Sequence, residues 1–138
     1  MKPNFSGDRP ARVSIRHESD LVVARSHARA LGAQAGLPEA SAEALATAVT
    51  EVARNIIVHA GYGDVFLAIV DEPSRRGVEV VIRDEGPGIS EPDQAMNDGY
   101  STGKGLGLGL PSARRLTDEF ELVTILGIGT TIRMRKWA

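Results

Sequence analysis

The chain has 138 residues, of which 42% are hydrophobic and 25% are charged, and its formal net charge is -2. We therefore expect a single globular domain over residues 1–138, with a flexible N-terminus at residues 1–10. The absence of a basic block argues against nucleic acid as a partner, and the absence of cysteine excludes disulfides and cysteine-ligated metals. No apolar run approaches the ~18 residues that span a bilayer, and residues 1–10 lack the apolar stretch of a signal peptide. The sequence thus predicts a cytoplasmic protein that does not enter membranes.

The N-terminal part of the chain predicts a strand and then a helix. Residues 13–15 alternate between apolar and polar side chains, as a short strand does. Residues 19–31 favour a helix, with Ser19 as its N-cap and Gly32 at its end.

The middle of the chain predicts a second helix and two strands. The helix is expected from Pro38, because apolar side chains recur at helical spacing between residues 45 and 56, and it should end at residues 61–63. The strands are expected at residues 65–70 and 78–83, which are rich in β-branched side chains, with a turn between them.

The C-terminal part begins with a loop-rich stretch that includes a short helix at residues 92–97. A third long helix at residues 108–117 is followed by strands at residues 121–126 and 130–136. Strands that follow one another without a helix between them favour antiparallel neighbours. The element order therefore predicts an α/β fold of the α+β kind, a two-layer sandwich in which helices cover one face of a mixed, mostly antiparallel sheet.

One row of polar side chains runs along the second predicted helix. Glu51 and Asn55 are four residues apart, so they share one side of the helix, and His59 extends the row by a turn. A carboxylate and a carboxamide oxygen at the edge of a pocket can orient a hydroxyl group and bind Mg²⁺. The row taken alone is more typical of a solvated helix face.

A carboxylate and two glycines follow the strand at residues 78–83. Asp84 can accept a hydrogen bond from an exocyclic amine, and Gly86 and Gly88, just before Ile89, let a planar ring approach the backbone. The alternative is an ordinary Gly-Pro turn after a strand.

A third candidate is the glycine-rich segment that opens the helix at residues 108–117. Its glycines expose backbone N–H groups, and a helix N-terminus favours anions, so a phosphate cradle is a reasonable interpretation. The spacing matches neither the P-loop nor the dinucleotide-binding motif, and a flexible hinge is the alternative. The residues expected to line this cradle are Lys104, Gly105, Leu106, Gly107, Leu108, Gly109 and Leu110.

These three segments, in this order and followed by Gly129-Thr130 in the last strand, resemble the Bergerat-fold (GHKL) superfamily of ATPases and kinases. The resemblance covers residues 13–137. The chain is too short for the long lids of the superfamily's hydrolases. It is most similar to the serine/threonine kinases of partner-switching systems, meaning anti-sigma factors and stressosome-type switch kinases. The closer match lies in Glu51–Asn55, Asp98–Thr102, Gly109–Pro111, Arg115-Leu116, Asp118–Phe120 and Lys136-Trp137.

The resemblance implies ATP and Mg²⁺ as cofactors and a role for each segment. Glu51 would be the general base towards a Ser or Thr hydroxyl, and Asn55 would bind the Mg²⁺. Asp84 would hold the adenine amine, with Gly86 and Gly88 making room for the ring and Thr130 supporting the same network. The backbone of residues 105–109 would clasp the phosphates. A phosphate contact by Lys104 is inferred from its charge alone, because it departs from the small residues of the family.

The resemblance also implies protein partners. The acceptor would be a STAS-domain antagonist protein, and the released kinase would bind and activate a PP2C-type phosphatase. The alternative is a nucleotide-dependent anti-sigma factor or phosphatase-binding module with little kinase activity, but Glu51 argues against it because a binding module needs no base. The sequence leaves the oligomeric state open.

Overall fold

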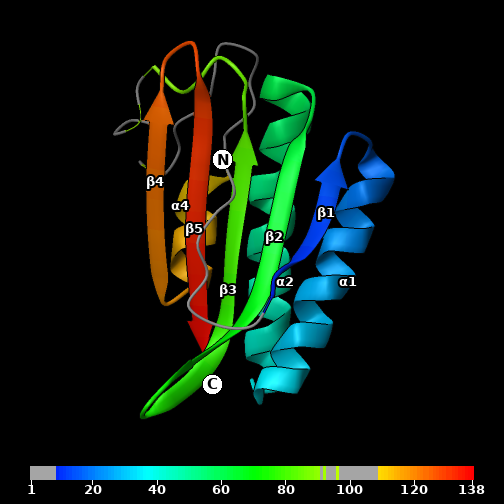
Figure 1. Cartoon of the computed structure of the whole chain (residues 1–138), viewed down its shortest axis with the longest axis vertical. Coiled ribbons are helices and arrows are strands. Elements are labelled where there is room, and N and C mark those ends of the chain that lie inside the picture. Colours follow the sequence, from blue (N-terminus) through cyan, green and yellow to red (C-terminus); the bar gives the residue numbers. More distant parts are fainter. Residues whose placement is uncertain (1–8, 91, 93–95, 97–108) are drawn as a thin grey trace.

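A five-stranded sheet with helices against one face makes up the part of the chain that the computed structural model describes, residues 9–90, 92, 96 and 109–138. Figure 1 shows the elements, which in chain order are β1 (Ala11–Ile15), α1 (Glu18–Ala35), α2 (Glu39–Asn55), η1 (Ile56–Ala60), β2 (Gly63–Glu72), β3 (Arg75–Asp84), α4 (Leu110–Leu116), β4 (Glu119–Ile125) and β5 (Gly129–Trp137).

The strands lie in the order β1-β2-β3-β5-β4, and each neighbouring pair is antiparallel. The expected α+β sandwich with a mostly antiparallel sheet is confirmed, and the sheet has no parallel pair among the described residues. Asp84, at the end of β3, lies opposite Thr130, near the start of β5. This pair joins two of the segments in which the sequence predicts site residues.

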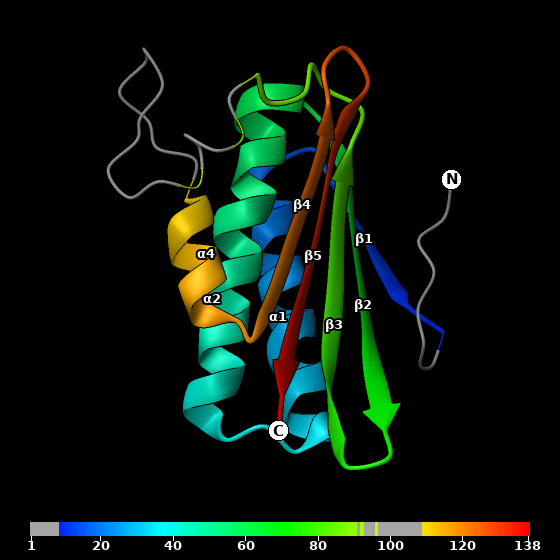
Figure 2. The ribbon, with the colours of Figure 1, turned by 90° about the vertical axis from the view of Figure 1, so that its left-hand side faces the viewer.

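The core lies between the sheet and the helices, which pack on one side of it (Figure 2). Alternate residues of the strands point into this core, as the two-residue period of a strand requires, and Val65, Leu67 and Val80 are fully buried there. α2 contacts both α1 and α4 and buries side chains at helical spacing, among them Leu45 and Val49. Burial of each such aliphatic side chain stabilises the fold by about 1.5–3 kcal/mol.

The start of α1 differs from the sequence-based prediction. Ser19 is not its N-cap, because the helix begins at Glu18 and His17 occupies the capping position. Asp20 supplies the missing acceptor: its Oδ2 accepts hydrogen bonds from the backbone N–H groups of Arg16 and His17, each at 2.9 Å. A carboxylate at the third residue of the helix thus satisfies backbone donors at and before the capping position, whereas a serine cap would accept from N–H groups inside the first turn.

The end of α1 also corrects a prediction. The helix continues through Gly32 to Ala35, and Gly36, with a φ of 90°, ends it in the left-handed conformation. Gly32 lies where α1 packs against α2, because a Cβ atom added there would come within 3.0 Å of the Ala42 Cβ. Its role is helix packing rather than helix termination.

α2 begins immediately after Pro38, and the helical segment ends at Gly61, as the sequence predicts. Its continuation, η1, is a π-helix, which the sequence does not predict. Gly61, with a φ of 89°, closes this wider turn, and its N–H donates to the carbonyl of Ile56 at 2.7 Å. Single π turns of this kind occur frequently at functional sites.

The hairpin between β2 and β3 is tighter than its apolar runs suggest. Cross-strand pairing continues from Gly63 opposite Asp84 to Glu72 opposite Arg75, although the sequence predicts a turn over residues 73–77. The polar side chains at this end are exposed, and the backbone ladder extends beyond the apolar residues that indicate a strand.

α4 corresponds to the helix predicted at residues 108–117, of which residue 108 lies outside the described residues. The short helix expected at residues 92–97 also falls largely outside them, although the Met96 N–H donates to the Pro92 carbonyl at 3.2 Å, as one helical turn requires. None of the helices that the structure describes is long and apolar enough to cross a bilayer.

Candidate functional site

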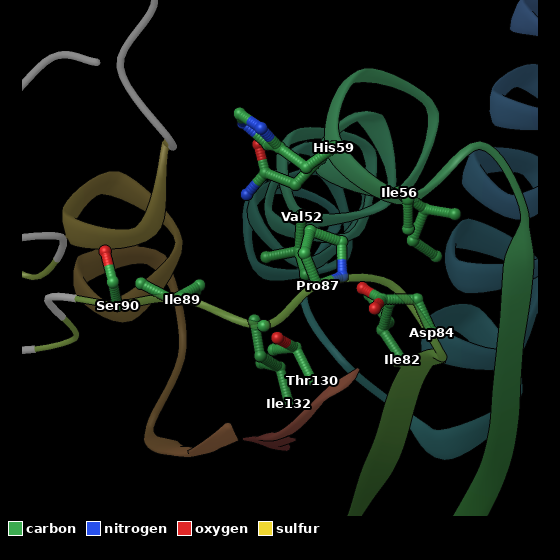
Figure 3. A pocket seen from close by; sticks show the side chains of 13 residues that line it. Val52, Ile56, His59, Ile82, Asp84, Pro87, Ile89, Ser90, Thr130 and Ile132 are labelled. Atoms are coloured by element: carbon green, nitrogen blue, oxygen red, sulfur yellow. The ribbon is translucent and has the colours of Figure 1, made fainter. Parts of the chain in front are cut away.

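A pocket opens at one end of the sheet, where η1, the end of β3 and the start of β5 meet (Figure 3). Its walls are mostly apolar, and a few polar groups point into it, as is typical of sites for small organic ligands. The lining residues are Val52, Asn55, Ile56, His59, Ala60, Ile82, Asp84, Pro87, Gly88, Ile89, Ser90, Thr130 and Ile132.

Five residues that the sequence predicts for the site line this one pocket. They come from three separate segments: Asn55 from the end of α2, Asp84, Gly88 and Ile89 from the end of β3 and the loop after it, and Thr130 from β5. Figure 3 shows Asp84 and Thr130 close together on the neighbouring strands.

Gly86 shapes the loop beside the pocket without lining it. Its N–H donates to Oδ1 of Asp84 at 2.8 Å, which orients that carboxylate. A Cβ atom at Gly86 would lie 2.5 Å from the Ala60 Cβ, so only glycine allows the loop to approach η1 this closely.

Gly88 and its neighbours attach the loop to the hairpin of β4 and β5. Gly88 has a φ of 79°, and a Cβ atom there would come within 2.6 Å of the Ile125 carbonyl oxygen. The Gly127 N–H donates to the Pro87 carbonyl at 2.9 Å, and the Ile89 N–H donates to the Thr124 hydroxyl at 2.8 Å. The hairpin therefore holds one wall of the pocket.

Glu51 lies one helical turn before Asn55 and is not among the residues that line the pocket. Its carboxylate lies against the start of α4, where its Oε2 is 2.7 Å from the position that a Cβ of Gly109 would take. Gly109 has a φ of 68°, and Leu110 after it is fully buried. The first predicted segment and the end of the third are thus neighbours in space.

The remaining residues of the predicted phosphate cradle lie outside the described part of the chain. They are Lys104, Gly105, Leu106, Gly107 and Leu108. Their roles stay predictions.

Three polar residues at or near the pocket were given no function in the sequence analysis, namely His59, Ser90 and Thr124. His59 lies in η1 and lines the pocket. Its position four residues after Asn55 was the sequence signal that could have placed it there. Thr124 lies behind Thr130, with the two hydroxyl oxygens 3.0 Å apart. Only the strand register, which pairs Thr124 with Thr130, brings this second hydroxyl to the site.

The pocket can hold a planar ring against aliphatic walls. Val52, Ile56, Ile82 and Ile132 supply apolar surface, and Asp84 supplies an acceptor for an amine on the ring. No three carboxylate or histidine side chains gather into a metal site among the described residues. Asn55 brings a carboxamide group to the pocket, and its oxygen is of the donor type that Mg²⁺ takes.

The chain belongs to the family of histidine kinase-like ATPase domains, whose model matches residues 15–136. Within that family it is similar to the serine/threonine-protein kinase RsbT of Bacillus subtilis, with 39% identity over 125 residues that cover 91% of this chain and 94% of that protein. It is also similar to the anti-sigma F factor of Bacillus cereus, with 32% identity over 122 residues that cover 83% of this chain and 82% of the relative.

A solved structure, the histidine kinase domain from the blue-light activated histidine kinase of Erythrobacter litoralis EL346, has the same fold. It aligns with a TM-score of 0.52 and 18% identity over 98% of this chain and 65% of its own. Together these comparisons confirm the resemblance to the GHKL superfamily and to its partner-switching kinases and anti-sigma factors.

Proposed function

We propose that residues 1–138 form one ATP-binding domain that acts as a protein serine/threonine kinase. The observation that carries this proposal is that Asn55, Asp84 and Thr130 line the same pocket. The chain is also 39% identical to a serine/threonine-protein kinase over 91% of its length. Glu51, beside the start of α4, adds a carboxylate next to that pocket.

The base of ATP would occupy the apolar part of the pocket. Asp84, oriented by the Gly86 N–H, would accept a hydrogen bond from the exocyclic amine. Gly86 and Gly88 let the loop after β3 pack against η1 and the hairpin of β4 and β5, which shapes the wall of the pocket, and Thr130 adds a hydroxyl group on the neighbouring strand.

The phosphates would lie towards the start of α4. Asn55 would bind the Mg²⁺ through its carboxamide oxygen, and when bound this ion neutralises charge on the phosphates. The backbone of residues 105–109, the Lys104 ammonium group and the segment up to Leu110 would hold the phosphate oxygens. Glycine-rich backbone at the start of a helix supports this assignment, because its N–H groups point towards anions.

Glu51 would act as the general base. The hydroxyl oxygen of a Ser or Thr on the substrate attacks the γ-phosphorus, the bond to the bridging oxygen breaks, and ADP leaves with its electron pair. Glu51 orients the hydroxyl group and takes its proton. Its position one turn before Asn55 supports this role, because base and metal ligand would then face the same phosphoryl group.

The relatives suggest the pathway. By its similarity to RsbT, the kinase would serve a stressosome-type partner-switching pathway in the cytoplasm, with a STAS-domain antagonist protein as substrate. The released kinase would bind and activate a PP2C-type phosphatase.

A second candidate function is a nucleotide-dependent anti-sigma factor or phosphatase-binding module with little kinase activity. The 32% identity to an anti-sigma F factor favours it. In that case a sigma factor or a phosphatase would be the principal partner, and ATP would serve as a structural ligand.

Transfer of phosphate from γ-labelled Mg-ATP to a STAS-domain protein tests the kinase proposal. We expect label on a Ser or Thr of the STAS protein, and a loss of about 10²–10⁴-fold in the transfer rate with Glu51→Gln, because general-base catalysis contributes that factor. The affinity for ATP should stay within about twofold.

Glu39→Gln is the matched control, since it makes the same change at the exposed start of the same helix. Full transfer by the Glu51→Gln variant would remove Glu51 as the base. ATP binding by the wild type without any transfer, together with nucleotide-dependent capture of a sigma factor, would favour the second function.

A further inference from the structure

The start of α4 lies against the side chain of Glu51, at a residue that has no Cβ atom. Apart from the neighbours of Gly109 in the chain, the three heavy atoms nearest to the place that its Cβ would take all belong to Glu51. They are Oε2 at 2.7 Å, Cβ at 3.4 Å and Cδ at 3.7 Å. The carboxylate of Glu51 therefore occupies the space that any other residue at position 109 would need for its side chain.

Packing and hydrogen bonding hold the backbone on both sides of this contact. Leu110 follows Gly109 and is fully buried, and the Gly109 carbonyl accepts the Ala113 N–H at 3.1 Å in the first turn of α4. In α2, Val52 follows Glu51 and is 1% exposed. The part of the contact that can move is thus the end of the Glu51 side chain, which is long and only half-buried.

A side chain at position 109 would therefore displace the Glu51 carboxylate rather than the backbone. Non-bonded heavy atoms prefer separations of about 3.5–4.0 Å, so Oε2 would have to retreat by roughly 0.5–1 Å or adopt another rotamer. A displacement of about 1 Å can lower a reaction rate by about 10²-fold when the displaced group must be aligned with the reacting atoms. The position of the carboxylate thus depends on the absence of a side chain at Gly109.

The backbone conformation of Gly109 is a separate reason for glycine, and a second glycine in the chain shares it. Gly109 has a φ of 68° and a ψ of 5°, in the left-handed region that strains other residues. Gly36, at the end of α1, has a φ of 90° and a ψ of 15°. A Cβ at Gly36 would meet nothing closer than the Ala138 Cβ, at 4.0 Å. Of these two glycines, only Gly109 also leaves room for Glu51.

We propose that Gly109 is a positioning residue for the base: its missing side chain leaves the space in which the Glu51 carboxylate is placed for the reaction. This inference rests on the proposed kinase function. It adds to the role proposed for the Gly109 backbone in holding phosphates. The two roles differ in what they predict, because a phosphate contact acts on ATP whether or not residue 51 can accept a proton.

Gly109→Ala is the informative substitution, because a methyl group is the smallest side chain that fills this space. Gly36→Ala is the matched control, because it brings the same left-handed strain to a residue that does not line the pocket. The rate of phosphate transfer to the STAS-domain protein is measured at saturating Mg-ATP for the wild type, both variants, Glu51→Gln and the double variant Glu51→Gln/Gly109→Ala. Calorimetry gives the affinity of each protein for Mg-ATP, and thermal unfolding checks that each one folds.

We expect Gly109→Ala to lower the transfer rate about 10- to 100-fold when Glu51 is present. In the Glu51→Gln background, the same substitution should change the residual rate by less than about twofold, because the group that it displaces no longer acts as a base. Gly36→Ala should transfer phosphate at the rate of the wild type. An equal loss from Gly109→Ala in both backgrounds would contradict the proposal, since a role in holding phosphates alone makes the two substitutions additive.

The same measurements separate this inference from the proposed function. If the wild type transfers no phosphate, the kinase proposal itself is wrong. If Glu51→Gln loses transfer but Gly109→Ala transfers at the rate of the wild type, the base is supported and only the role of Gly109 is wrong.

Discussion

Glu79 on β3 is a carboxylate that is fully buried, although it lies on the face of the sheet away from the helices. Arg135 on β5 donates to its Oε1 through Nε at 2.8 Å, and the Nε of Arg133 lies 3.6 Å from the same oxygen. Its Oε2 has no hydrogen-bond partner among the described residues. Desolvation is the largest influence on the pKa of Arg135 and lowers it, but the hydrogen bond and charge of Glu79 outweigh it and leave this pKa raised.

Removing either Glu79 or Arg135 alone leaves the other charged side chain without its main partner. We therefore expect the losses in unfolding free energy from the two substitutions to be strongly non-additive. Arg135→Leu should destabilise the fold by about 3–5 kcal/mol, since it removes the hydrogen-bonded partner of the buried Glu79 carboxylate and leaves only the longer contact with Arg133. The double variant Glu79→Leu/Arg135→Leu should be clearly more stable than Arg135→Leu. Urea unfolding of the single and double variants measures this, and additive losses would show that the two side chains act independently.

At the scale of single elements, the start of α1 depends on a charged carboxylate. The backbone N–H groups of Arg16 and His17 donate to Asp20, and these bonds are the main reason that its pKa is lowered. A carboxyl group whose pKa is lower in the folded state stabilises the fold above its unfolded pKa, and this contribution is lost as the pH falls through the folded pKa.

We therefore expect Asp20→Asn to be less stable than the wild type at neutral pH. The difference in unfolding free energy should shrink as the pH falls through the ordinary range of a carboxyl group and vanish below the lowered pKa of Asp20. Glu18→Gln in the same helical turn is the control for loss of a charge. Urea unfolding from neutral to acidic pH tests this, and a difference that stays constant with pH would rule out the charged cap.

Trp137, at the end of β5 and away from the pocket, makes contacts with two neighbouring strands. The Trp137 backbone N–H donates to Asp118 and its indole N–H donates to Glu119, both at 2.7 Å. The guanidinium of Arg75 lies 3.7 Å from the centre of the Trp137 ring, at a distance that favours a cation–π interaction. These contacts link the start of β3, the start of β4 and the end of β5.

Local signals in the sequence predicted the elements but not all of their ends. Pro38 and Gly61 mark the limits of the second helical segment because capping and turn residues act locally. The predicted end of the first helix at Gly32 was wrong, because this glycine allows α1 to pack against α2, and that packing depends on tertiary structure. The π turn of η1 has no comparable signal in the sequence.

At the scale of the whole molecule, the site combines segments that are far apart in the chain. Asn55 and Asp84 could be predicted because their side chains carry recognisable chemistry at a helix end and a strand end, and Thr130 because Gly129-Thr130 resembles the superfamily. The position of Thr124 behind Thr130 could not, because it depends on the register of β4 against β5. The attachment of the loop after β3 to that hairpin likewise follows only from the fold.

The claim on which the account depends most is that this pocket binds the base of ATP through Asp84. The measurement is calorimetric titration of Mg-ATP into the wild type and into Asp84→Asn, with Asp71→Asn on the distant hairpin as the control. In Asp84→Asn one of the two acceptor oxygens becomes an NH₂ donor, so either the Gly86 N–H or the adenine amine meets a donor in place of an acceptor, and we expect a loss of about 10- to 100-fold in affinity for this variant alone. Equal affinity of the wild type and Asp84→Asn would contradict the account.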